Sequence, residues 1–421
     1  MAGIWDKVRS WWPARQMTEQ SYQEQSEKLV ARAPIPVFWL FGKTGSGKTS
    51  IVRFLTGAER AEIGNGFAPQ TRHSQQYDFP ADAPPVLRFL DTRGLGESRY
   101  DPAEDIERFD QQAQMVIVVV RAMDHALEPI VEPLKAIRRA KPERPVLLAL
   151  TTLHEAYPQR QHPTVDPFDA EGRLLNEPAN AEDAPLPDEL RRSLDKQRER
   201  FAGLVDRIVP IDFTQPEDGF EQTDFGGERL HAALMELLPA AYRQTMIELQ
   251  QAVGSERDER DRRAMTYVVG YSTLAATAAA VPIPWVDIPV VMGIQSHLIY
   301  RLGVIYGEPM NASLAAQTFS AIGGRLLTKM LLRESLKIIP YIGMAANAAL
   351  AYAYTFGLGK AVCWYLRQTQ KGRRPTDAEV ERVWQEQIQA AAAHWRRQKK
   401  AAGIDSSADA SGAASSAEAD A

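Results

Sequence analysis

The sequence predicts an α/β domain with a mainly parallel sheet of six strands, followed by an all-α, Ala-rich hydrophobic domain. Residues 34–245 alternate short apolar runs with helical patterns, which is typical of parallel strands joined by crossover helices. Residues 264–400 carry long apolar stretches of helical composition instead. A glycine-rich loop at residues 42–49 joins the first expected strand to the first expected helix.

Most of the expected strands are short apolar runs, and the patterns between them have helical spacing. The strands are expected at residues 35–41, 74–79, 86–90, 116–120, 146–150 and 208–213. The helices are expected at 49–56, 102–114, 128–140, 187–205 and 227–238. Residues 157–184 are rich in Pro, Asp, Glu and Asn, so a loop insertion is expected there.

Composition narrows the class of protein. A chain of 421 residues with 44% hydrophobic and 24% charged residues has room for two or three folded domains. A net charge of −5 does not indicate nucleic-acid binding. The one cysteine, Cys363, excludes a disulfide scaffold and a cysteine-based zinc site. No signal-peptide pattern is visible at the first residues, so we expect a protein that stays on the cytoplasmic side.

The glycine-rich loop matches the pattern G-x-x-x-x-G-K-[ST] in full and is called the P-loop below. Its glycines allow a tight turn that brings backbone N–H groups to face phosphates, and the helix that follows points its positive end at the same anion. Lys48 is expected to neutralise the outer phosphates, and the Thr49 hydroxyl to bind Mg²⁺. The residues expected to bind the nucleotide here are Gly42, Lys43, Thr44, Gly45, Ser46, Gly47, Lys48, Thr49 and Ser50.

Two further segments fit a magnesium nucleotide. The strand at 86–90 continues into Asp91-Thr-Arg-Gly94, a D-x-x-G pattern about 40 residues after the P-loop. Asp91 is expected to hold Mg²⁺ through its water and Gly94 to approach the γ-phosphate. Thr71, in the polar loop before the second strand, is the expected second magnesium hydroxyl. Arg93 is a candidate to stabilise developing charge, which completes a catalytic set with Lys48, Thr71 and Gly94.

In this order and spacing, the P-loop, the loop threonine and the strand followed by DTRG resemble the translation-factor-class GTPases, and within them the Era-like group. The resemblance covers residues 34–245. It implies a six-stranded G domain with switch loops at 58–72 and 92–100, and it implies GTP/GDP and Mg²⁺ as ligands. A slow GTP hydrolase that works as a molecular switch is the function implied.

The base-reading segment departs from the family pattern N-K-x-D. The residues there are Thr151, Thr152, Leu153, His154 and Glu155, with His154 at the position of the family's aspartate and Glu155 one place on. The last base-contact loop is 210–214, and Leu95 stands where a water-orienting glutamine is expected. These departures leave open a nucleotide-binding scaffold without turnover and an ATPase. A membrane transport component is the least favoured alternative.

Beyond residue 245 the character changes. A helix dense in both charge signs is expected at 246–263 as a connector. Residues 264–286 and 338–359 then carry no charge and are long enough to span a membrane, but prolines interrupt them and alanine dominates. A soluble bundle, an interfacial hairpin and true membrane spans all remain open.

Motifs in this region resemble a bacterial helical domain of unknown function that often accompanies Era-like GTPase domains. They are the segment 281–289, Gln295, Tyr306-Gly307, the segment 339–343 and Gly-Leu-Gly-Lys360. The resemblance implies a role at a membrane or in an assembly. It leaves open a homodimer through the G domain or the helical domain.

The two ends of the chain carry weaker signals. Residues 1–33 are expected to form an amphipathic helix and a connector, with Trp5, Trp11 and Trp12 on one face beside basic residues. An amphipathic helix at 377–400 ends in a basic cluster, and residues 401–421 are expected to be disordered. Together with the Ala-rich domain, these features favour peripheral attachment to inner-membrane lipid of a bacterium.

Overall fold

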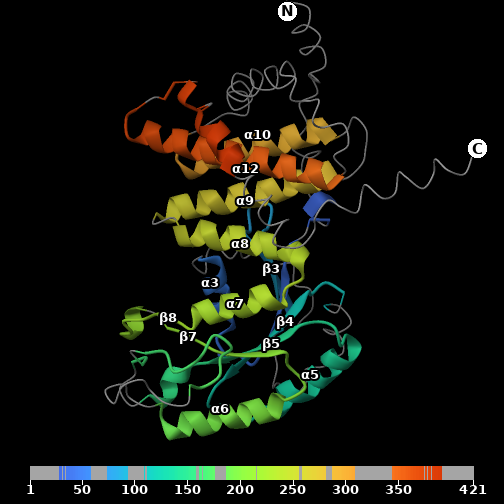
Figure 1. The fold of residues 1–421 in the computed structure, drawn as a ribbon, viewed down its shortest axis with the longest axis vertical. Coiled ribbons are helices and arrows are strands. Elements are labelled where there is room, and N and C mark those ends of the chain that lie inside the picture. Colours follow the sequence, from blue (N-terminus) through green and yellow to red (C-terminus); the bar gives the residue numbers. More distant parts are fainter. Residues whose placement is uncertain are drawn as a thin grey trace, which may run out of the picture. The chain divides into compact units, whose positions relative to one another are not determined.

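The computed structural model forms two compact units, Pro34–Ser255 and a second made of Met1–Ala33 with Glu256–Ala421 (Figure 1). The residues that the structure describes are 28–30, 32–33, 35–57, 74–92, 109, 111–157, 161–163, 165–175, 186–214, 216–255, 258–280, 287–308, 344–373, 375–376, 378–380 and 382–390.

The first unit is built on a six-stranded sheet with the order β2-β3-β1-β4-β5-β6. Strand β2 pairs antiparallel with β3, and every other pair in this sheet is parallel. The strands are β1 Val37–Phe41, β2 Ser74–Phe79, β3 Leu87–Thr92, β4 Met115–Arg121, β5 Val146–Thr151 and β6 Arg207–Pro210. The mainly parallel α/β fold expected from the sequence is confirmed.

Helices cover both faces of this sheet (Figure 1). Every residue of β1 and β5 is buried, which explains why these strands read as continuous apolar runs rather than alternating ones. One face packs into a single core with helices α5, Glu128–Ala140, and α6, Asp188–Phe201. The remaining helices of this unit are α3 Lys48–Thr56, α7 Gly227–Leu237 and α8 Ala240–Ser255.

Two expected helices end earlier in the structure. Of the helix expected at 102–114, the structure describes residues 109 and 111–114, and residues 111–114 are not helical. The reason is that Gln114 pairs with β1: its N–H donates to Val37 O at 3.0 Å, and its Oε1 accepts from Val37 N at 2.7 Å. Helix α6 ends at Phe201 rather than residue 205 because Gly203 takes a left-handed conformation, with φ +73°.

The last expected strand, 208–213, divides in two. Strand β6 ends at Pro210, and β7, Asp212–Phe213, pairs instead with β8, Asp224–Phe225, in a separate two-stranded sheet. Phe213 stacks on Phe54 of α3, with ring centroids 4.4 Å apart. The chain turns away from the main sheet at this point, which brings Asp212 towards the loop after β5.

In the second unit, helices α9, Glu259–Ala280, and α12, Met344–Gln370, pack closely, and α10, Asp287–Ile305, packs against both. A Cβ atom on Gly359 would lie 2.6 Å from Val268 Cγ2, so a glycine is needed where α12 crosses α9. The buried Gln295 donates to Thr355 Oγ1 at 3.0 Å across α10 and α12. Residues 378–380 and 382–390 are also helical, within the amphipathic segment expected at 377–400.

The charged connector expected as one helix at 246–263 is divided between two. Helix α8 ends at Ser255, Asp258 lies in a bend, and α9 begins at Glu259 and continues into the apolar stretch. Asp258 Oδ1 accepts from Arg260 N at 2.9 Å, which is a helix-capping contact that favours a new helix start here. No helix among the described residues has a stretch long and apolar enough to cross a membrane.

Candidate functional site

The P-loop connects β1 to α3, and its backbone explains its glycines. Gly45 and Gly47 have positive φ, +75° and +95°, which other residues rarely adopt. Gly47 is the N-cap of α3 and supplies no side-chain cap. The N–H groups of the first helical turn therefore depend on a partner other than a capping side chain, and phosphate oxygens suit them.

Gly42 has a different reason to be glycine. A Cβ atom there would lie 2.3 Å from Val119 O of β4, so the loop packs directly against the sheet backbone. Ser46 is buried, and Lys48 and Ser50 are half-buried. Thr44, Gly45 and Thr49 are exposed at the surface of the loop. The loop thus has a fixed base on β4 and an open outer side.

Lys48 and Lys43 have different surroundings. Lys48 Nζ donates to Gly42 O at 2.8 Å and to Lys43 O at 3.0 Å, and it lies 3.7 Å from Asp91 Oδ1 of β3. Its ammonium group is therefore held within the loop, beside a carboxylate. Lys43 Nζ instead pairs with Asp124 Oδ2 at 2.7 Å, in the turn after β4. Lys48, which the sequence predicts to meet phosphates, thus stays within the loop, whereas the Lys43 side chain ties the loop to the turn after β4.

The described residues offer oxygen ligands of the kind that Mg²⁺ prefers. Thr49 is exposed in the first turn of α3, and Asp91 lies near the end of β3 beside Lys48. No cluster of three or more His, Cys, Asp or Glu side chains suited to a metal occurs among the described residues. A site in which the Thr49 hydroxyl and the Asp91 carboxylate bind Mg²⁺ together with phosphate oxygens of a nucleotide needs no such cluster. Thr71, Arg93, Gly94 and Leu95 lie outside the described residues, as does nearly all of both expected switch loops.

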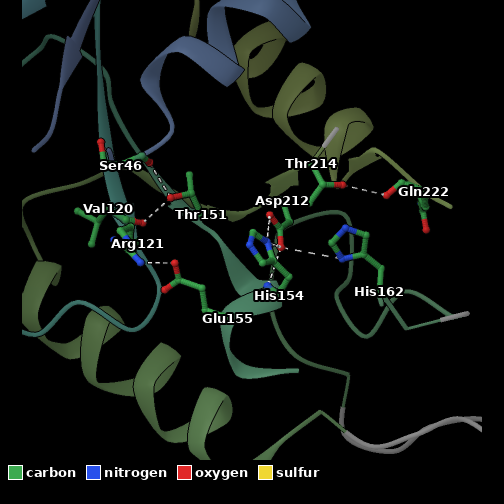
Figure 2. A network of polar contacts seen from close by, with 10 residues as sticks. All are labelled: Ser46, Val120, Arg121, Thr151, His154, Glu155, His162, Asp212, Thr214 and Gln222. Carbon is green, nitrogen blue, oxygen red and sulfur yellow. Dashed lines mark hydrogen bonds and ion pairs between the residues drawn. The ribbon is translucent and has the colours of Figure 1, made fainter. Parts of the chain in front are cut away.

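The structure gives Thr151 a role other than base contact. At the end of β5, its Oγ1 donates to Ser46 O at 2.7 Å and lies 3.2 Å from Val120 O (Figure 2). A Cβ atom on Gly47 would lie 3.4 Å from Thr151 Cγ2. Thr151 therefore ties the P-loop backbone to the ends of β4 and β5, and the base-reading segment starts directly beside the P-loop.

The next residues form a single turn. Thr152 has a left-handed φ of 53° and caps the 3-10 turn η1, Leu153–Ala156. Glu155 forms an ion pair with Arg121 at the end of β4 (Figure 2). The carboxylate that the sequence offers as a substitute for the family's aspartate is therefore engaged by an arginine.

His154 is held by a residue that sequence reasoning did not single out. Asp212 of β7 accepts from the His154 backbone N–H at 2.7 Å, and both of its oxygens lie within 2.9 Å of His154 Nδ1 (Figure 2). This hydrogen bond, against some burial, raises the pKa of His154 above its ordinary value. The sequence did point to the loop 210–214, which contains Asp212. That Asp212 contacts His154 becomes visible only in the structure, where the chain turns away from the main sheet after β6.

A second histidine faces the same carboxylate. His162, from the insertion after η1, lies with its Nδ1 4.0 Å from Asp212 Oδ2, and its side chain is 2% exposed. Its ring stacks on Phe225, with centroids 4.8 Å apart, and tilts against Phe220 at 5.0 Å. Burial lowers the pKa of His162, and the charge of His154 lowers it further.

Two family models match this chain. A model described as 50S ribosome-binding GTPase matches residues 37–152, which contain the P-loop, Asp91 and strands β1 to β5. A model described as a domain of unknown function, DUF697, matches residues 245–393, which contain α9, α10 and α12. The chain carries a P-loop GTPase domain followed by a DUF697 domain. The first match supports guanine-nucleotide binding by this site.

One curated relative is magnetosome membrane protein 22 of Magnetospirillum gryphiswaldense, 30% identical over 109 residues. The match covers 24% of this chain and 56% of that relative, so it spans only about half of the relative's length.

Similar solved structures are more distant. One is the LeoA bacterial dynamin GTPase from ETEC, at 12% identity and TM-score 0.36, covering 92% of each chain. Another is Toc33 from Arabidopsis thaliana in complex with Mg²⁺ and GMPPNP, at 14% identity and TM-score 0.27, covering 58% of this chain and 96% of that one.

Proposed function

We propose that this protein is a GTP-dependent molecular switch that hydrolyses GTP slowly with Mg²⁺ and works at a membrane surface through its helical domain. Within the P-loop GTPases, the order and spacing of its motifs favour the Era-like group. The observation that carries the proposal is the P-loop geometry. Gly47, in a left-handed backbone conformation, precedes α3 and provides no capping side chain, and Lys48 lies beside Asp91.

The magnesium part of the proposal rests on donor chemistry. Thr49, Thr71 and Asp91 would hold the ion, which bridges phosphate oxygens and neutralises their charge when it is bound. Lys48 supplies a second positive charge to the outer phosphates. Gly94 and Arg93 would meet the γ-phosphate, so that its release after hydrolysis frees both switch loops.

Slow turnover follows from a missing group. Leu95 cannot orient an attacking water as a glutamine would, so intrinsic hydrolysis should be slow or should need an activator. Attachment to lipid is supported by the N-terminal tryptophans and by the membrane assignment in the relative's name. The surface of the DUF697 domain would then transmit the nucleotide state.

The test of the phosphate site is Lys48→Ala, with GTP binding measured by titration calorimetry in the presence of Mg²⁺. We expect at least about a 100-fold loss of affinity, because a half-buried cation that meets phosphate is removed. The matched control is Lys196→Ala, an exposed lysine on α6, which should bind as the wild type does. Unchanged GTP affinity in a folded Lys48→Ala protein would contradict the proposal.

A nucleotide-binding scaffold without turnover is a second candidate, and Leu95 is the observation that favours it. The two are separated by phosphate release from GTP, measured with and without anionic liposomes. A switch should show slow release that depends on Lys48 and rises with liposomes. A scaffold should bind GTP with the same affinity and release no phosphate under either condition.

A further inference from the structure

The chemistry of the base-reading segment centres on the pair formed by His154 and Asp212. Since the His154 Nδ1 edge faces both oxygens of Asp212 and its backbone N–H also binds that carboxylate, the ring is fixed in one orientation. Nδ1 must carry a hydrogen to satisfy Asp212. The opposite edge of the ring, with Nε2, therefore points away from the carboxylate (Figure 2).

The position of this ring follows from its neighbours. Thr151, three places earlier, is bonded to the P-loop carbonyl of Ser46, and His154 lies in the 3-10 turn η1 that follows directly after Thr152. The ring packs edge-on against Phe220, with centroids 5.2 Å apart, while 29% of the side chain stays exposed. His154 is thus a rigid, accessible polar group beside the nucleotide loop.

The charge of the pair is set by burial. The Asp212 side chain is 2% exposed, and a buried carboxylate needs a cation or several hydrogen bonds. The negative charges of Glu155 and Asp218 also raise the pKa of His154. Of the two histidines that face Asp212, burial lowers the pKa of His162, whereas the hydrogen bond to Asp212 raises that of His154. A protonated His154 both donates to the buried carboxylate and balances its charge.

We propose that His154, held as an imidazolium by Asp212, reads the nucleotide base by donating its Nε2–H to the 6-oxo group of a purine. This inference rests on the proposed function. It predicts that the site prefers guanine and hypoxanthine, which carry a 6-oxo acceptor, over adenine. The 6-amino group of adenine is a donor and cannot accept from Nε2–H. We expect the 2-amino group of guanine to contribute little, because Glu155 Oε1 pairs with Arg121 and both oxygens of Asp212 face His154 Nδ1. Asp212 acts as a positioning residue.

The experiment compares GTP, ITP and ATP by titration calorimetry on the full chain with Mg²⁺. ITP keeps the 6-oxo group and lacks the 2-amino group. We expect GTP and ITP to bind within about threefold of each other and ATP to bind at least about tenfold more weakly. An ITP affinity more than about tenfold below that of GTP would overturn the proposal, because a carboxylate would then be reading the 2-amino group.

Variants locate the effect. His154→Ala should lower GTP and ITP affinity to the level of ATP, with ATP binding unchanged. The matched control is His162→Phe, which keeps an aromatic ring against Phe225 and should leave the order of the nucleotides unchanged. If His154→Ala does not fold, Asp212→Asn replaces it, because this variant keeps the shape of the site and removes the charge that sustains the imidazolium. A wild-type GTP-to-ATP ratio in whichever of these variants folds would overturn the proposal.

The pH profile separates a positioning role from a structural one. Because Asp212 raises the pKa of His154, the imidazolium persists below that pKa and is lost as the pH rises through it. The GTP-to-ATP affinity ratio should fall as the pH rises through that pKa, by up to about tenfold per pH unit, and Asp212→Asn should move that fall to lower pH. The ratio cancels titration of the phosphates, and a ratio independent of pH would overturn the proposal.

Failure of this inference can be told from failure of the proposed function. If GTP, ITP and ATP all bind equally and Lys48→Ala abolishes binding of each, the phosphate site stands and the reading of the base is wrong. If none of the three binds to the wild-type protein, the proposed function itself is wrong, and this inference falls with it.

Discussion

A single hydroxyl group connects the phosphate loop to the sheet. Thr151 Oγ1 donates to Ser46 O at 2.7 Å, at the point where a loop with two left-handed glycines must keep its shape. The loop has no side-chain cap, so its backbone depends on such contacts. The position that the sequence offers for base contact therefore also holds the P-loop in place.

We predict that Thr151→Val weakens both the fold and the site. Valine has the same shape but leaves the Ser46 carbonyl without its donor, which should cost about 1–2 kcal/mol of unfolding free energy. GTP affinity should fall severalfold, measured by calorimetry beside urea denaturation. Thr273→Val removes a buried hydroxyl that binds Val269 O within α9, and it should leave GTP affinity unchanged. Wild-type GTP affinity in Thr151→Val would show that the hydroxyl does not support the loop.

The two histidines at Asp212 should respond to pH in opposite directions. Burial lowers the pKa of His162, so below the ordinary value of about 6.5 the unfolded chain binds more protons than the folded one, and stability is lost as the pH falls. His154 has a raised pKa, so its contribution is present at low pH and is lost as the pH rises.

We predict that His162→Phe reduces the loss of stability on the acid side. As the pH falls below about 6.5, the urea midpoint of the variant should rise relative to that of the wild-type protein, because the buried group that resists protonation is gone. Phenylalanine keeps the stack on Phe225, so packing changes little. An equal pH dependence in both proteins would mean that His162 does not control this pH response.

At the scale of elements, local patterns predicted most of the first unit. Strand β2 and helix α5 have the expected bounds, and the amphipathic pattern of α5 explains its own. The differences arise where a distant contact decides. Gln114 leaves its helical pattern to pair with Val37, and Asp212 leaves the sheet to meet His154. The same reasoning applies to the site: a local motif places the P-loop, whereas Asp212 is found only through tertiary structure.

The crossing of α9 and α12 depends on the missing side chain of Gly359. We predict that Gly359→Leu destabilises this packing by about 1–3 kcal/mol, because even a Cβ atom would lie 2.6 Å from Val268 Cγ2. Hydrogen exchange should become faster in α9 and α12 and stay unchanged in β4 and β5. Gly254→Ala, in α8, has no atom within 4 Å of its added Cβ and should be neutral or slightly stabilising. Unchanged protection in α9 and α12 would contradict the close packing.

At the scale of the whole molecule, the apolar stretches of the DUF697 domain bury themselves against one another. Val268 and Leu274 of α9 are nearly fully buried, as are Leu298 of α10 and Leu366 of α12. Hydroxyl groups in α9 bond back to its own carbonyls, as Ser272 does to Val268 O at 2.6 Å. In the described parts of the two apolar stretches, 264–280 and 344–359, many apolar side chains are thus used in helix packing, and alanine adds little energy of transfer into lipid.

The last prediction concerns attachment to lipid. A single amphipathic segment binds lipid weakly, so we expect the N-terminal tryptophan face and the helical domain to act together. The protein should sediment with membranes and be released in part by high pH or high salt, and replacing Trp5, Trp11 and Trp12 with Ser should weaken sedimentation further. Replacing Trp39, buried in β1, cannot serve as a control because it would disturb the core. The matched control is Leu175→Ser, an exposed apolar residue of the first unit, which should leave sedimentation unchanged. Full resistance to alkaline extraction would mean that a segment spans the bilayer. Absence of liposome binding with either GTP or GDP would mean that attachment through these faces does not occur.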